Sequence, residues 1–295
     1  MVLNSLDRIV TGYFPEVRAR LTVANVTDTA RTLERNHLCG PTAGLIQAEM
    51  VGGIVLLGTL LERENQAISL RMIFPDGSLG GASLECTAGF TVRGYTRQKI
   101  LADLDDSDAS DEEIFRRALG SKAQCGVVIT EGTSASNTLF NVSSDDCISV
   151  TDIVEEYFCR SLQRSALVQV SGATSNGYVS CVHSLMCEIL PEADADTHKL
   201  IRKRFDAPEV LRLLDDGADL ATLATALGLG HAEDVVERPV AFACSCSSDR
   251  VMKMLASLPK EDLEAMIAED RPHDIYCHMC GKGFTITVDQ LKGLL

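Results

Sequence analysis

Positive charge is scarce in this sequence. Its 27 lysines and arginines face 42 aspartates and glutamates, which gives a formal net charge of -15 at pH 7. Such an acidic chain is repelled by phosphate backbones and by anionic lipid. The composition therefore predicts no nucleic-acid partner and no membrane partner.

Long hydrophobic runs are also absent. The longest, residues 50–61, has twelve residues, whereas a membrane-spanning helix needs about 20. The first residues, MVLNSLDRIVTGYF, include Asp7 and lack the basic start and apolar core of a secretory leader. We therefore expect no export and a reducing, cytoplasmic environment, in which closely spaced cysteines bind metals or act as redox groups.

Signatures of catalysis are missing as well. The sequence contains no G-x-S-x-G elbow, no Walker loop and no H-E-x-x-H motif. Cys39 follows His37 closely enough to suggest a thiol nucleophile, but the sequence offers no third group to orient the pair. We expect no catalytic residues and predict that the protein is not an enzyme.

The chain from 1 to 190 alternates strand-like and helix-like patterns. Strands are expected at 68–74, 90–95, 126–130, 138–142, 167–170 and 178–190, separated by turn sequences such as Pro75-Asp76-Gly77. Two helices are expected, a buried one over 41–62 and an amphipathic one over 150–163. These patterns predict an α+β fold, with a mixed α-helix and β-sheet domain over residues 1–190.

Residues 191–240 change to helical periodicity with mixed charge. Pro208, Gly217 and either Gly228 or Gly230 divide this stretch into pieces. Each piece is shorter than the roughly 12 to 15 residues that an isolated helix needs in water. We expect a metastable helical linker that takes its stability from neighbouring parts of the protein. Residues 241–295 follow as a small domain rich in cysteine.

Four of the eleven cysteines form a paired pattern in this last segment. Cys244-Ser-Cys246 is followed, after thirty intervening residues, by Cys277-His-Met-Cys280-Gly281. The stretch 240–246 is strand-like, and in a strand residues i and i+2 point to the same face, while Gly281 can adopt the left-handed conformation of a tight turn. Four thiolates fill the tetrahedral coordination of zinc and leave no position for a catalytic water. The pattern predicts one structural or redox-sensing Zn²⁺.

Alternatives to this interpretation stay open. The four cysteines could be buried structural residues, and His273 or His278 could replace a ligand. A constitutive zinc-ribbon module for protein interactions is the alternative function. Most of the other seven cysteines are expected in the core, because free cysteine is among the most buried residue types. They are Cys39, Cys86, Cys125, Cys147, Cys159, Cys181 and Cys187.

A zinc site of this kind would couple oxidation to folding. Zinc contributes on the order of 10 to 16 kcal/mol to the folding of such small modules. The same sulfurs cannot hold zinc and form disulfides at once, so oxidation would eject the ion and melt residues 241–295. The linker helices would then lose support and expose their Leu and Val faces.

With these motifs the chain resembles the redox-regulated heat-shock chaperones of thirty-three kilodaltons, a family whose members are also called chaperonins. The matching segments besides the cysteine pattern are VRARL at 17–21, Pro75-Asp76-Gly77, EEYFCRS at 155–161 and SLPKEDLEAMI at 257–267. The resemblance covers nearly the whole chain. It implies an N-terminal α+β domain, a helical linker and a C-terminal zinc domain.

The resemblance also implies a function. Members are ATP-independent holdases that are inactive when reduced and zinc-bound, become active under combined oxidative and unfolding stress, and bind unfolded or partly unfolded client proteins. The implied zinc ligands are Cys244, Cys246, Cys277 and Cys280, and the implied disulfides are Cys244–Cys246 and Cys277–Cys280. A homodimer is implied for the oxidised form. The seven further cysteines depart from the family pattern and leave the number of disulfides open.

Overall fold

The computed structural model describes residues 6–191 and 193–295, and it divides into two units. Unit 1 spans Met1–Phe242 and unit 2 spans Ala243–Leu295. Unit 1 contains two β-sheets with helices, and unit 2 contains a short hairpin with helices. The predicted α+β class is confirmed.

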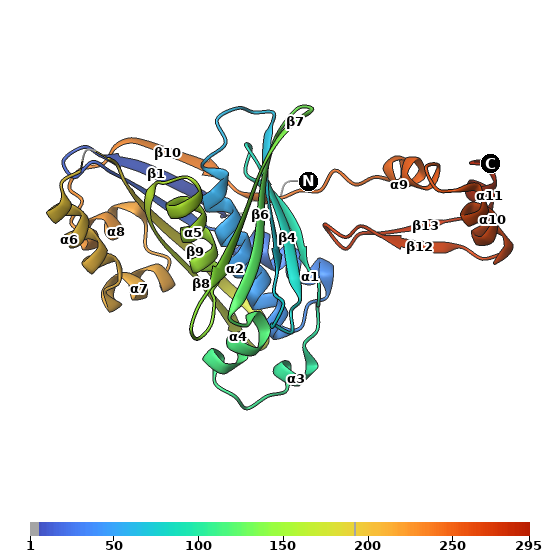
Figure 1. The fold of residues 1–295 in the computed structure, drawn as a ribbon, viewed down its shortest axis with the longest axis horizontal. Coiled ribbons are helices and arrows are strands. Elements are labelled where there is room, and N and C mark those ends of the chain that lie inside the picture. The colour runs from blue at the N-terminus through green and yellow to red at the C-terminus, as the bar shows by residue number, and fades with distance from the viewer. Residues whose placement is uncertain (1–5, 192) are drawn as a thin grey trace. The chain divides into compact units, whose positions relative to one another are not determined.

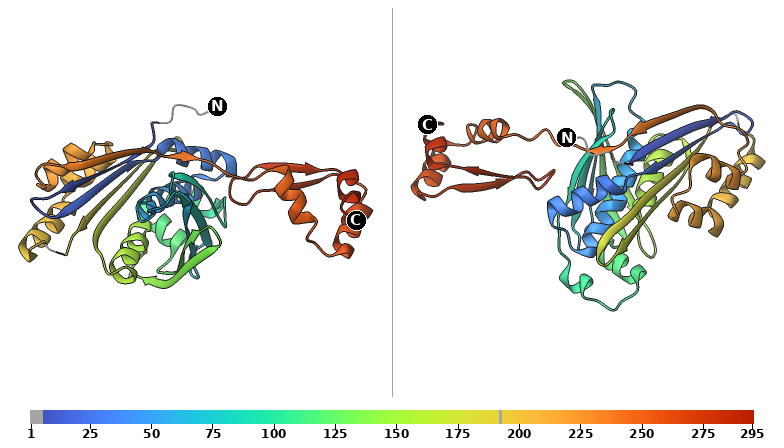
Figure 2. Two further views of the ribbon diagram at one scale, coloured as in Figure 1. Left: turned by 90° about the horizontal axis from the view of Figure 1, so that it is seen from above. Right: turned by 180° about the vertical axis from the view of Figure 1, so that it is seen from behind.

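The first sheet of unit 1 has the strand order β10-β1-β2-β9-β8, and all neighbouring strands in it are antiparallel. Its strands are β1 (Arg8–Phe14), β2 (Ala19–Asn25), β8 (Ser165–Ser175), β9 (Tyr178–Ile189) and β10 (Glu233–Pro239). Strand β10 comes from the C-terminal end of the unit and runs beside the N-terminal β1 (Figure 1; Figure 2).

The second sheet has the order β11-β5-β4-β3-β6-β7. Its strands are β3 (Gln66–Ile73), β4 (Gly81–Thr87), β5 (Thr91–Thr96), β6 (Lys122–Glu131), β7 (Ser134–Ser143) and β11 (Ala241–Phe242). The pairing of β11 with β5 is parallel, and the other pairings are antiparallel. One continuous segment, β10 and β11, therefore supplies an edge strand to each sheet.

Helix α2 (Pro41–Gly58) is the centre of the main core. It contacts strands of both sheets, and most of its residues are buried. Within the described residues, it is the helix long and apolar enough to cross a membrane, but 83% of that window is buried inside the protein. The buried helix predicted over 41–62 is confirmed, with an earlier end at Gly58.

Further helices complete the N-terminal part of unit 1. They are α1 (Thr27–His37), α3 (Ala102–Asp105), α4 (Asp111–Leu119) and α5 (Val150–Glu156), which continues into the π-helical turn η1 (Tyr157–Ser161). The predicted capping box of α5 is present, because the Ser149 hydroxyl accepts the N–H of Asp152 while the Asp152 carboxylate accepts the N–H of Ser149.

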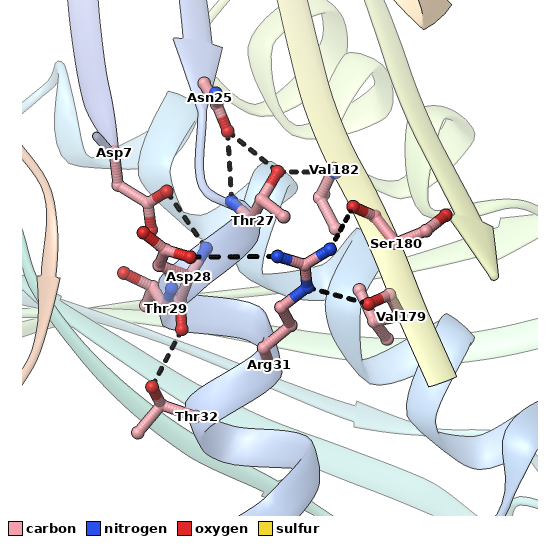
Figure 3. Close-up of polar contacts among 10 residues, drawn as sticks. All are labelled: Asp7, Asn25, Thr27, Asp28, Thr29, Arg31, Thr32, Val179, Ser180 and Val182. Atoms are coloured by element: carbon pink, nitrogen blue, oxygen red, sulfur yellow. Dashed lines mark hydrogen bonds and ion pairs between the residues drawn. The ribbon is translucent and has the colours of Figure 1, made fainter. Parts of the chain in front are cut away.

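The start of α1 is tied to strands β1 and β9 (Figure 3). The buried Asp7 carboxylate accepts the N–H groups of Asp28 at 3.0 Å and Thr29 at 2.6 Å. Arg31 donates to the carbonyl oxygen of Val179 at 2.9 Å. Burial raises the pKa of Asp7, and the two N–H donors at the positive end of the helix oppose that rise. The result is a fixed position for the chain entering β1.

The linker contributes three helices and a strand. The helices are α6 (Ala195–Phe205), α7 (Pro208–Asp215) and α8 (Leu220–Leu227), and they lie over the outer face of the first sheet (Figure 1). The prediction of helix throughout 191–240 is wrong at Glu233–Pro239, which form β10. Two β-branched residues, Val235 and Val236, occupy this segment beside the backbone groups of β1, which a strand can pair and a helix cannot.

Unit 2 is small and has its own core. Its elements are α9 (Ser248–Leu255), α10 (Lys260–Ala268), β12 (His273–Tyr276), β13 (Gly283–Ile286) and α11 (Val288–Lys292). Strands β12 and β13 form an antiparallel hairpin. The buried apolar residues of this core are Leu255, Leu263, Ile286 and Leu291. So few buried side chains stabilise a folded domain weakly, and domains below about 70 residues commonly need a metal or disulfides in addition.

Candidate metal centre

The four cysteines of unit 2 converge on one point. Their sulfur atoms all lie within 4.8 Å of one another. The Sγ atoms of Cys246 and Cys280 are 3.4 Å apart, and those of Cys244 and Cys277 are 3.9 Å apart. A tetrahedral site with metal–sulfur bonds of about 2.3 Å has sulfur–sulfur edges of about 3.8 Å. The group therefore has the size and the donor set to hold a metal ion.

The second cysteine pair is held by the turn between β12 and β13. The N–H of Gly281 donates to the carbonyl oxygen of Cys277 at 2.8 Å, and Gly281 has the predicted left-handed backbone with φ of 72°. The backbone N–H of Lys282 donates to the Cys280 sulfur. Such N–H groups disperse negative charge on metal-bound thiolates, so this turn is suited to ligation.

In the sequence, the first pair follows β11 and precedes α9. The prediction of a strand through Cys244 and Cys246 is wrong, because the ladder of β11 with β5 ends at Phe242 and residues 243–247 are not in a strand. Arg250 in α9 donates to the carbonyl oxygen of Ser245 at 3.1 Å. Residue types and spacing gave no signal for this arginine, which places a positive charge beside the C-x-C segment.

The electrostatics of the cluster favour a bound cation. Burial raises the pKa of the Cys246 and Cys280 thiols. Four neighbouring thiolates would also repel one another strongly in the absence of positive charge. A divalent cation with an affinity for sulfur removes both penalties, and its binding releases the thiol protons.

The two histidines that could have replaced a ligand lie outside this group. Within the described chain, the residues that meet metal-ligand geometry here are cysteines alone. The Nε2 atom of His273 lies 2.9 Å from the carbonyl oxygen of Met266, so it connects β12 to α10. His278 lies inside the Cys277–Cys280 turn and is not one of the four converging groups.

The cysteines outside the cluster are mostly in environments that disfavour the thiolate. Cys39 donates to the side-chain oxygen of Gln47 at 3.5 Å, and burial raises its pKa to about 11. That is the reverse of an activated nucleophile. The prediction that most of the seven are core residues is correct for the buried Cys86, Cys125 and Cys187. Of the four partly exposed cysteines, Cys39 still packs against the main core, whereas the prediction is wrong for Cys147, Cys159 and Cys181. Two of these four, Cys39 and Cys147, lie in loops.

A second feature relevant to function is the covered face of the first sheet. Apolar side chains from the sheet and from α6, α7 and α8 form one cluster whose buried members are at most 8% exposed. The sheet supplies Phe14, Leu21, Leu167, Leu185, Cys187 and Ile189, and the helices supply Ile201, Phe205, Val210, Leu214, Leu223 and Leu227. The three helices have 11, 8 and 8 residues. Helices this short are only marginally stable in isolation. We call α6, α7 and α8 the cover, and expect it to fold only against the sheet.

Comparisons with known proteins agree with this architecture. The profile of the family described as "Hsp33 protein" matches residues 7–287. The chain is 24% identical to the 33 kDa chaperonin of Lachnoclostridium phytofermentans over 98% of both chains, and 26% identical to that of Bacillus licheniformis over 98% of this chain and 99% of the relative.

A solved structure extends the likeness to the fold. The crystal structure of the 33 kDa chaperonin, a heat shock protein 33 homolog, from Thermotoga maritima superposes with a TM-score of 0.85 at 17% identity, over 98% of each chain. The family match covers both the sheet domain and most of the cysteine-bearing unit. The chain therefore belongs to the Hsp33 family of chaperones.

Proposed function

We propose that this protein is a redox-regulated, ATP-independent holdase whose four cysteines bind one zinc ion in the resting state. The observation that carries the proposal is a juxtaposition along the chain. The segment from α6 to β11 ends at Phe242, and its three helices cover an apolar sheet face. Ala243 and the first cysteine of the cluster, Cys244, follow immediately. A change at the cysteines therefore acts directly on the end of the segment that carries these helices.

Zinc is the metal that best fits the donor set. Four sulfurs form a closed tetrahedral site, which is typical of structural zinc and leaves no position for substrate. The ligands would be Cys244, Cys246, Cys277 and Cys280. Unit 2 has few buried apolar residues, so the metal would supply a large part of its folding free energy.

Oxidation would remove the metal by consuming its ligands. With peroxide as oxidant, each pair of thiolates loses two electrons to one H₂O₂ and forms one S–S bond. The O–O bond of the peroxide breaks, and two protons complete its conversion to two waters. Two such steps yield two disulfides and free Zn²⁺. We assign the pairs Cys244–Cys246 and Cys277–Cys280 from the family resemblance; all four sulfurs lie within 4.8 Å, so proximity permits this pairing and others.

Loss of the metal would then loosen the cover. Strand β11 has two residues and β10 has no buried residue, so apart from Val240 and Phe242, which pack in the main core, this segment has little side-chain packing to resist fraying. Fraying continues into helices that are marginal without the sheet. Heat or another unfolding stress lowers their stability further, which explains a combined requirement for oxidation and unfolding stress.

The opened state would bind clients through the exposed apolar face of the first sheet. Unfolded or partly unfolded proteins present apolar side chains that match such a surface. The family resemblance adds a homodimer in the oxidised state. We place the resting protein in the reducing cytoplasm, where the cysteines stay thiolates, and assign it neither catalysis nor nucleic-acid or membrane binding.

Oxidation of the zinc-loaded protein tests this proposal. Peroxide at mildly elevated temperature should release one zinc per chain, form disulfides among the four cysteines and switch on suppression of client aggregation. Zinc release followed with a chromogenic chelator, disulfide mapping by mass spectrometry and light scattering of a denatured client give the three readouts. Full suppression by the reduced, zinc-bound protein with no gain on oxidation would instead indicate a constitutive zinc-ribbon interaction module.

Removal of one ligand tests the metal site. Cys280→Ser should reduce bound zinc from one per chain to none, unfold unit 2 and give measurable holdase activity without oxidant. Cys181→Ser, which changes a partly exposed cysteine outside the cluster, should bind zinc like the parent protein. Metal analysis and circular dichroism provide the measurement. Retention of full zinc content by Cys280→Ser would disprove the assigned ligand set.

Two adjacent residues of α6 test the cover. Ile201 is 2% exposed in the cluster with the sheet, whereas Leu200 is 47% exposed. Ile201→Ala should destabilise the cover by about 2 to 5 kcal/mol, so the reduced, zinc-bound variant should bind a hydrophobic dye and suppress aggregation. Leu200→Ala should behave like the parent protein. Equal behaviour of the two variants would show that burial of α6 against the sheet does not control activity.

A further inference from the structure

Strand β10 occupies its place without a fully buried side chain. All seven of its residues, Glu233–Pro239, are exposed. Its side-chain contacts include an ion pair between Arg8 and Glu237 at 3.8 Å, with both groups more than half exposed, and Arg238 over the Phe90 ring at 5.8 Å. Exposed pairs of this kind contribute little. The strand is therefore held mainly by its backbone.

One hydrogen bond at the start of β1 shows which backbone groups of this strand face β10. The N–H of Val240 donates to the carbonyl oxygen of Asp7 at 3.1 Å. In an antiparallel ladder the bonded pairs recur at every second residue, so the backbone groups of Ile9 and Thr11 face β10, opposite Arg238 and Val236. The intervening residues of β1 face β2 instead.

Proline falls where this ladder tolerates it. Pro239 is opposite Arg8, a residue whose backbone groups face β2. The missing N–H of Pro239 therefore costs no hydrogen bond to β1. Proline and charged residues such as Glu233, Asp234 and Glu237 also make the free edge of β10 a poor template for further strands. In the resting protein β10 thus protects the sheet from edge-to-edge association.

Strand β1 is fixed independently of β10. It pairs with β2 at every position from Arg8 to Phe14. At its start, the Asp7 carboxylate is bonded to the N-terminus of α1 (Figure 3). Departure of β10 would therefore leave an ordered strand with the N–H and C=O groups of Ile9 and Thr11 unpaired.

We propose that the β1 edge, once β10 has left it, is a docking site that takes an extended segment of an unfolded client as an added strand. This inference rests on the proposed function and specifies how the client is held. Backbone pairing needs no particular sequence, as the exposed side chains of β10 already show. Alternate side chains of the added strand would lie beside Val10 and Phe14, on the face that α6, α7 and α8 cover at rest.

The best clients would be extended segments with alternating apolar residues and without proline. One row of their side chains would contact the apolar face, while the backbone pairs with β1. The apolar face alone would equally accept helical or collapsed chains, so the preference for an extended backbone distinguishes the edge from the face.

The test uses the oxidised full-length protein and a labelled synthetic peptide with the sequence of residues 231–242. The peptide should bind and should compete with a denatured client. N-methylation of the peptide at position 238 removes one of the N–H groups that face β1, and should weaken binding about fivefold. The matched control, N-methylated at 237, carries the same number of methyl groups on an N–H group that faces away in the regular part of the ladder, and should bind like the parent peptide.

The outcomes separate this inference from the proposed function. Methylation-sensitive binding that competes with the client supports the docking site. Absence of peptide binding, equal binding of both methylated peptides, or binding without competition overturns it, even when the oxidised protein suppresses aggregation. Failure of the oxidised protein to suppress aggregation at all would instead contradict the proposed function.

Discussion

The outer face of the first sheet must be covered, and the helices that cover it are too short to fold without it. This mutual dependence sets the behaviour of the whole chain. Residues such as Phe14, Leu185 and Ile201 are almost completely buried in the interface, so the interface is strongly hydrophobic. The conformational entropy that three short helices and two edge strands lose on folding opposes this burial and reduces the net free energy that maintains the interface.

The cysteine cluster gives this dependence a chemical input. Unit 2 has a small core, so a metal among the four sulfurs would decide whether it is folded. The two units are joined through β11, a strand of two residues. Under the proposed function, a metal site that oxidation would remove is thus connected along the chain, through the two residues of β11 and strand β10, to the helices that cover the first sheet. Neither part would act as a switch alone.

Much of this could be predicted from the sequence, and the reasons are local. The α+β class, the buried helix α2 and the helices of the linker follow from periodicity and from prolines and glycines. The cysteine spacing also suffices to predict the turn of the second pair, because two residues between Cys277 and Cys280 and a following glycine allow one compact turn.

The rest depends on distant partners. Strand β10 is stabilised by pairing with the edge of β1, which comes from the opposite end of unit 1 in the sequence. No local pattern encodes that pairing. The contact of Arg250 with Ser245 is likewise visible only in the folded loop, and the depth of Cys187 under the cover could not be distinguished from that of Cys86 in the main core.

That last pair of cysteines offers the most direct measurement of the central claim, which is that activation uncovers the first sheet while the main core stays folded. Cys187 lies beneath the linker helices, Cys86 lies in the core around α2, and both are fully buried. Maleimide labelling followed by peptide mass spectrometry should find both protected in the reduced, zinc-loaded protein. In the oxidised, aggregation-suppressing protein Cys187 should be labelled while Cys86 stays protected. Equal protection of the two cysteines in the active protein, or equal labelling of both, would contradict the account.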